Sequence, residues 1–182
     1  ANAVSSLHGR VTRRSWQVLW PHLREDAVPI GHITNGVHVR TWLATAMQDL
    51  YNQHIGPDWL DHLTDPKMWA RIDRVTDAEL WETHQKLKQR LVTFVRDRVR
   101  ARRERIGESP EEIRAVNAIL DPEILTIGFA RRFATYKRGA LLFSDPDRLL
   151  RMLNDLARPV QFIFAGKAHP RDEGGKALIQ EV

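Results

Sequence analysis

Two short apolar runs, residues 124–129 and 160–165, constrain the fold more than any other feature of the sequence. They start about 36 residues apart, which is the separation that a helical crossover between two parallel strands requires. The segment between them includes residues 147–156, where leucines recur at helical spacing, and Pro159 then resets the chain before the second run. The pattern predicts an α/β fold with one βαβ unit in residues 121–182.

A strongly basic loop follows the first apolar run. Arg131, Arg132, Lys137 and Arg138 place four cations within eight residues. Ligands of parallel sheets bind beyond the carboxyl ends of the strands, and we expect a helix from about residue 137 whose first N–H groups add partial positive charge. Lys167 follows the second run at the same predicted edge, as a possible further contributor. The loop therefore predicts a phosphate-binding site.

Residues 1–120 have a different pattern, with helical spacing and long loops. We expect a helix over residues 2–19, a helix that Thr41 caps and that ends near Gln53, and a long helix over about 77–106. The long helix opens at Thr76, because Thr-Asp-Ala-Glu has the form of a capping box. The change of pattern predicts a domain boundary near residue 121.

The second half of the long helix carries seven arginines between residues 90 and 105. The formal net charge of the chain is +5, so anionic partners are plausible. One interpretation is a surface for nucleic acid or an acidic protein, and the other is a solvated outer face of the helix. No aromatic residue is interleaved with the arginines beyond Phe94, which favours the solvated face.

Several classes of protein are excluded by composition. The chain has no cysteine, which excludes disulfides and thiolate metal sites, and no apolar run approaches the roughly 20 residues of a membrane span. His32 and His38 lack a nearby third ligand, so we expect no metal site. These features fit a cytoplasmic protein. Both ends cut into regular patterns, so we expect an internal piece of a longer polypeptide.

Four segments, taken in order, resemble one enzyme family. They are Val-Ser-Ser-Leu-His-Gly at 4–9, Ile-Thr-Asn-Gly-Val-His-Val-Arg-Thr-Trp-Leu at 33–43, Arg-Arg-Phe-Ala-Thr-Tyr-Lys-Arg at 131–138 and Phe-Ala-Gly-Lys-Ala-His-Pro at 164–170. Their order and spacing resemble the α-glucan (glycogen or maltodextrin) phosphorylases of the bacterial branch. Each segment is weak alone, and the ordered set is specific.

The resemblance implies a GT-B architecture of two Rossmann-like domains. Residues 1–120 would form the C-terminal part of the N-terminal glucan phosphorylase domain, mainly helical here, and residues 121–182 the start of the C-terminal phosphate and cofactor domain. The implied enzyme is a glycosyltransferase of carbohydrate metabolism that uses inorganic phosphate to release glucose 1-phosphate from an α-1,4-glucan. The implied cofactor is pyridoxal phosphate.

The family's roles transfer to four positions of the basic loop. Arg132 and Lys137 match ligands of the substrate phosphate, Arg131 stands where the family has a lysine that contacts the cofactor phosphate, and Tyr136 matches an aromatic residue near the sugar. Residues 134–135 depart from the family's His-Glu pair. The family's Schiff-base lysine lies outside this chain, so we expect no catalytic residue here and no activity without the rest of the polypeptide.

Two other functions remain open from the residues alone. A nucleotide-sugar-dependent glucan synthase of GT-B architecture also places an Arg/Lys pair on a diphosphate. A binding module for nucleic acid or an acidic partner would instead use the basic helix.

Overall fold

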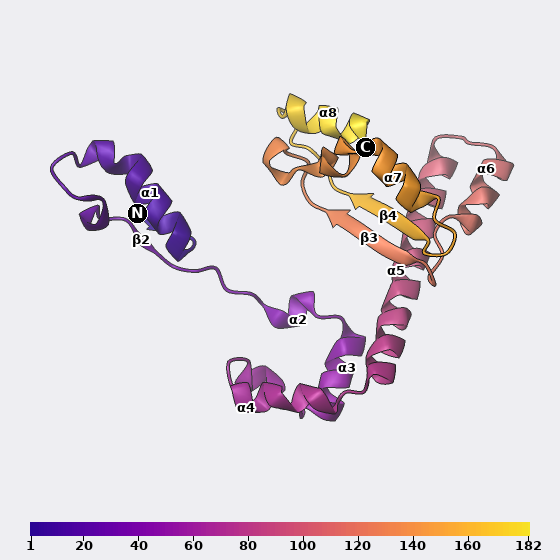
Figure 1. Ribbon diagram of the computed structural model, residues 1–182, viewed down its shortest axis with the longest axis horizontal. Helices are drawn as coiled ribbons and strands as arrows, with labels where there is room; N and C mark the ends of the chain where they lie inside the picture. The colour runs from indigo at the N-terminus through magenta and orange to yellow at the C-terminus, as the bar shows by residue number, and fades with distance from the viewer. The chain divides into compact units, whose positions relative to one another are not determined.

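The structure is a computed structural model that describes residues 1–182 (Figure 1). The chain forms two compact units, residues 1–70 and 71–182, and each is described by itself. It is mostly helical, with two parallel sheets of two strands each. The predicted boundary near residue 121 concerns the domains of a longer protein and stays a prediction.

The first unit begins with a strand that the sequence pattern did not reveal. The strands and α-helices of this unit are β1 (Asn2–Ala3), α1 (Ser6–Trp16), β2 (Gly31–His32), α2 (Val39–Trp42), α3 (Thr45–His54) and α4 (Pro66–Trp69). Ala3 lies opposite His32 in a parallel pair and is fully buried. The helix predicted over residues 2–19 starts only at Ser6, because the Ser5 hydroxyl accepts a hydrogen bond from the His8 N–H at 3.1 Å.

Three aromatic rings form the core beside α3. Tyr51, Trp59 and Trp69 pack edge to face, with ring centroids 5.3 to 5.9 Å apart. Trp59 is fully buried, and its indole N–H donates to the Asn52 side-chain oxygen at 3.0 Å. The indole N–H is therefore satisfied inside an apolar cluster.

The helix predicted from Thr41 to Gln53 is wrong, because the chain contains two helices there. Leu43 and Ala44 have extended backbones, with ψ of 124° and 145°, and they separate α2 from α3. The Thr41 hydroxyl lies 2.7 Å from His38 Nδ1 instead of capping a helix. Apolar spacing continues across the break, so periodicity did not reveal it.

The second unit contains the long helix and the larger sheet. Its main elements are α5 (Asp77–Arg105), α6 (Pro110–Ala115), η5 (Val116–Ala118), β3 (Leu125–Ala130), η6 (Thr135–Lys137), η7 (Gly139–Ser144), α7 (Pro146–Leu153), β4 (Val160–Ala165) and α8 (Glu173–Glu181). The capping box at the start of α5 is confirmed. The Glu79 N–H donates to the Thr76 hydroxyl at 3.2 Å, and the Glu79 carboxylate accepts from the Thr76 N–H at 3.1 Å.

The strands β3 and β4 are parallel, as the sequence predicted, and all six residues of one lie opposite the six of the other. Figure 1 shows the two arrows side by side and pointing the same way. Alternate residues of β3 face opposite sides of the sheet. Ile127 and Phe129 line a hollow with η7, whereas Thr126 and Ala130 line one with α5.

The α-helix predicted from about residue 137 is wrong. The segment after β3 forms the 3₁₀ helices η6 and η7, separated by Arg138 in the left-handed conformation (φ 56°, ψ 40°). A left-handed residue cannot continue a right-handed α-helix. The first α-helix of the crossover is α7, which the Asp145 carboxylate caps by accepting from the Arg148 N–H at 3.0 Å. The basic loop therefore lacks the amides of an α-helix start, and its charge comes from side chains.

Arginines of α5 hold the chain that leads into β3. Arg96 donates to two carbonyls, from Nε to Ile119 at 2.9 Å and from Nη2 to Leu120 at 2.6 Å. Leu120 has a φ of 58°. This left-handed conformation is unfavourable in free energy for any residue other than glycine. The next residue, Asp121, exchanges backbone hydrogen bonds with the Gln161 amide at 2.7 and 2.8 Å. The start of β3 is thus fixed from both α5 and β4.

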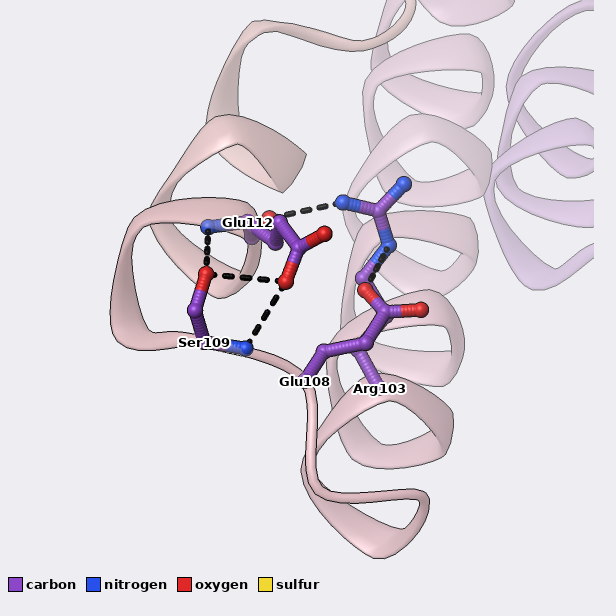
Figure 2. Close-up of polar contacts among 4 residues, drawn as sticks. All are labelled: Arg103, Glu108, Ser109 and Glu112. Carbon is purple, nitrogen blue, oxygen red and sulfur yellow. Dashed lines mark hydrogen bonds and ion pairs between the residues drawn. The ribbon is translucent and has the colours of Figure 1, made fainter.

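Two further arginines bind the α6 segment to α5. Arg100 donates to the Asn117 side-chain oxygen at 2.7 Å. Arg103 donates to the Glu112 carbonyl at 2.7 Å and forms an ion pair with Glu108 at 3.2 Å (Figure 2). Together with Arg96 they lie at helical spacing on one side of α5. We call these three residues the arginine clamp.

Substitution of Arg96 tests the clamp. Arg96→Met removes two charged hydrogen bonds to partly buried carbonyls, and we expect it to lower the free energy of unfolding by about 2 kcal/mol. The matched control is Arg98→Met on the same helix, where the guanidinium is exposed and has no protein partner, with an expected change within about 0.5 kcal/mol. Urea unfolding measures both, and equal losses would contradict the clamp.

The capping box of α6 predicts a pH dependence. Hydrogen bonds from the Ser109 backbone and hydroxyl hold the pKa of Glu112 below its ordinary value (Figure 2). Because the pKa is lower in the folded state, the contribution of Glu112 to stability is complete above the unfolded pKa and is lost as the pH falls through the folded one. Carboxyl NMR titration should show Ser109→Ala raising the Glu112 pKa, while Glu111 serves as the internal control.

Candidate phosphate site

The loops that follow β3 and β4 run side by side at the carboxyl edge of the sheet. The Arg131 N–H donates to the Ala165 carbonyl at 3.2 Å, and the Phe133 N–H donates to the Lys167 carbonyl at 3.1 Å. Phe133 is 4% exposed, and its ring packs on Phe129 with centroids 5.6 Å apart. This buried ring anchors an otherwise exposed cationic loop, and the sequence reasoning did not single it out.

Two glycines allow the basic loop to lie directly on its neighbours. A Cβ atom on Gly166 would stand 2.0 Å from the Arg131 carbonyl oxygen. A Cβ atom on Gly175, in the first turn of α8, would stand 2.4 Å from the Phe133 carbonyl oxygen. Both distances are far below van der Waals contact, so the backbone positions that carry Arg131 and Phe133 depend on these two glycines.

Two cations of the loop line one hollow of about 410 Å³ at the end of β3. Arg131 is exposed and Lys137 is half-buried, and the other lining residues are Gly128, Phe129 and Ala130. No carboxylate lines the hollow. Two positive charges beside apolar and backbone walls suit an oxyanion, for which arginine and lysine donate charge-assisted hydrogen bonds.

The other predicted site residues lie around this hollow or beside it in the chain. Tyr136 is 68% exposed, and the Lys137 ammonium lies 4.9 Å from the centroid of its ring, within cation–π distance. Lys167 joins the loop through its backbone carbonyl, and its side chain is exposed. Arg132 is exposed and does not line the hollow. The structure thus gathers Arg131, Lys137 and Tyr136, while the roles of all five residues stay predictions.

The structure contains no group of three or more histidine, aspartate or glutamate side chains placed to hold a metal ion. Of the two histidines considered from the sequence, His32 lies in β2 and His38 contacts Thr41. No helix is long and apolar enough to cross a bilayer.

The basic half of α5 divides into two sets of arginines. The arginine clamp uses its guanidinium groups inside the fold. Arg98, Arg102 and Arg105 are exposed, and they line a shallow hollow of about 300 Å³ on another side of the helix. The interpretation of the whole stretch as a solvated face is therefore corrected, because three of its arginines hold α6 and the start of β3. Helical spacing alone could not separate the sets, since both recur at three and four residues.

No protein-family profile matches the chain. The chain is 46% identical over 182 residues to a glycogen phosphorylase of Mycobacterium tuberculosis, 42% over 181 to a maltodextrin phosphorylase of Thermococcus litoralis and 41% over 181 to a glycogen phosphorylase of Aquifex aeolicus. The chain is homologous to a part of these phosphorylases. Each alignment takes in 100% of this chain and 21% to 26% of the relative.

The homology confirms the resemblance to the glycogen and maltodextrin phosphorylases that the four segments predicted. It also weighs against the two alternatives, since the relatives are named as phosphorylases rather than as glucan synthases or nucleic-acid-binding proteins. The chain spans about a fifth to a quarter of the length of these relatives.

The close approach at Gly166 gives a testable consequence. Gly166→Ala forces the two loops apart, because the added Cβ meets the Arg131 carbonyl and the Phe133 ring. We expect the free energy of unfolding to fall by about 3 kcal/mol and the amide NMR signals of residues 131–137 to shift. Gly128→Ala is the control, because no atom lies within 4 Å of its added Cβ. Equal stability of the two variants would contradict the packing described.

Proposed function

We propose that the chain is the part of an α-1,4-glucan phosphorylase that supplies one side of its phosphate site. The complete enzyme would have GT-B architecture, with its second Rossmann-like domain starting near residue 121, and would release glucose 1-phosphate from glycogen or maltodextrin. The observation that carries the proposal is the coincidence of two findings. Homology to phosphorylases extends along the whole chain, and a cationic loop without carboxylates lies at the carboxyl edge of parallel strands.

The charges of the loop fit the chemistry of two neighbouring phosphate groups. Lys137 and Arg132 would hold the substrate phosphate, and Arg131 the phosphate of the cofactor. Two dianions side by side repel each other, so the site needs several fixed cations to offset that repulsion. Arg131 and Lys137 reach one hollow and pair with no carboxylate, so their charge remains for an external anion.

Pyridoxal phosphate suits this donor set through its phosphate group only. When bound, the cofactor would supply a phosphate that exchanges a proton with the substrate phosphate. Arg131 is the residue of this chain proposed to contact it, since its backbone is fixed against Ala165 and its guanidinium is exposed at the hollow. The Schiff-base lysine is assigned to no residue of this chain.

Tyr136 would contact the glucosyl unit next to the substrate phosphate. Its ring is exposed and lies beside the Lys137 ammonium. A sugar stacked on the free face of the ring would bring its anomeric carbon near the phosphate that Lys137 holds. The ammonium would then hold the non-bridging oxygens of the phosphate, which keep their negative charge when another phosphate oxygen bonds to the anomeric carbon.

Phosphorolysis by the complete enzyme tests the proposal. Arg132→Met and Lys137→Met should each lower kcat/KM for inorganic phosphate by about 10²-fold, as removal of one charge-stabilising donor does. The control is Arg151→Met on α7, an exposed cation away from the loop, which should leave the rate unchanged. Release of glucose 1-phosphate from maltoheptaose measures all three.

Two results would overturn the proposal. One is glucose transfer from a nucleotide sugar without phosphorolysis, which would indicate a glucan synthase. The other is an unchanged phosphate dependence in both loop variants. The 182-residue chain alone should release no glucose 1-phosphate, because it holds only part of the proposed phosphate site.

A further inference from the structure

Arg138 has an unusual backbone conformation for a residue of the basic loop. Its φ of 56° and ψ of 40° lie in the left-handed region, which glycine adopts readily and most other residues do not. The next residue, Gly139, could adopt this conformation without steric cost, yet its φ is not positive. Strain of this kind persists only where the surrounding structure fixes it, and it is typical of functional sites.

Hydrogen bonds hold the backbone of Arg138 from both sides. Its N–H donates to the Thr135 carbonyl at 3.1 Å and closes η6, while its own carbonyl accepts from the Leu141 N–H at 3.1 Å at the start of η7. Gly139 is buried, and a Cβ atom added to it would stand 3.3 Å from a carbon of the Phe133 ring. A side chain at 139 would press on that ring, so the glycine serves packing and the turn falls on residue 138.

The left-handed turn sends two consecutive cations to different hollows. Lys137 lines the hollow of the candidate phosphate site together with Arg131. Arg138 is exposed and lines another hollow of about 390 Å³, whose other lining residues, from the sheet and η7, are apolar or glycine. A right-handed residue at 138 would continue η6 into η7 as one helix. Lys137 and Gly139 could then not both keep their places.

We propose that Arg138 is a positioning residue of the phosphate site and acts through its backbone. Its left-handed conformation holds Lys137 at the hollow while Gly139 stays on the Phe133 ring. This inference rests on the proposed function of Lys137 as a ligand of the substrate phosphate. It separates the cations of the basic loop by role, because Lys137 contributes charge whereas Arg138 contributes a turn.

Three uncharged replacements of Arg138 in the complete enzyme separate conformation from charge. Glycine and asparagine tolerate the left-handed region, whereas the branched side chain of valine does not. Arg138→Gly and Arg138→Asn should therefore keep kcat/KM for inorganic phosphate within about threefold of the original value, and Arg138→Val should lower it by about tenfold or more. Equal values for the three variants, lowered or not, would overturn the proposal, as would a loss of about tenfold in Arg138→Gly alone.

A double variant tests whether Arg138 acts through Lys137. If it does, the valine has nothing left to disturb once Lys137 is replaced. Lys137→Met combined with Arg138→Val should then have the same kcat/KM for phosphate as Lys137→Met alone. A residue that only supports the fold would lower the rate again in the double variant, and such additive losses would overturn the proposal.

Leu120 provides a matched control for strain as such. Its φ of 58° is nearly that of Arg138, and it lies outside the basic loop. Leu120→Val imposes the same conformational penalty, so it should lower the midpoint of urea unfolding and leave kcat/KM for phosphate unchanged. A loss of kcat/KM equal to that of Arg138→Val would show general destabilisation and would contradict the assignment to Arg138.

The same measurements distinguish failure of this inference from failure of the proposed function. An unchanged phosphate dependence in Lys137→Met would remove the proposed function and this inference with it. An impaired Lys137→Met enzyme beside an unimpaired Arg138→Val enzyme would remove this inference alone.

Discussion

The parallel pairing of β3 with β4 is the constraint on which the candidate phosphate site depends. The ladder continues past both strands, where the Arg131 and Phe133 N–H groups bond to the Ala165 and Lys167 carbonyls. These bonds need the two loops to approach more closely than a Cβ atom at Gly166 would permit. Loop geometry is thus set by backbone bonding and glycine, and the cationic side chains are carried on that frame.

The cationic side chains of the second unit fall into two groups, which differ in what they bind. In the arginine clamp, guanidinium groups donate to carbonyls of residues 112, 119 and 120, so that charge is used inside the fold. In the basic loop, Arg131 and Lys137 line a hollow without a carboxylate. Net charge alone does not distinguish these two uses, whereas the identity of the bonded partner does.

The sequence predicted those features that depend on local pattern. The two strands, the capping box at Thr76 and the parallel crossover follow from apolar runs, a four-residue motif and a separation in the chain. The helix after the basic loop was predicted wrongly, because a left-handed Arg138 leaves no mark on apolar spacing. The extended break at Leu43 was missed for the same reason. The role of Gly166 depends on a backbone that lies 35 residues earlier, Arg131, and no local pattern records such a contact.

The environment of Lys88 is another feature that local sequence pattern does not record. In the sequence it is one more lysine in a charged helix, two residues after Lys86. Lys86 pairs with Glu82 one turn away on the same helix, whereas Lys88 is 9% exposed and lies beside residues of β3. A lysine stem can follow an apolar wall while its ammonium reaches water, and the α5 and β3 residues around Lys88 form such a wall.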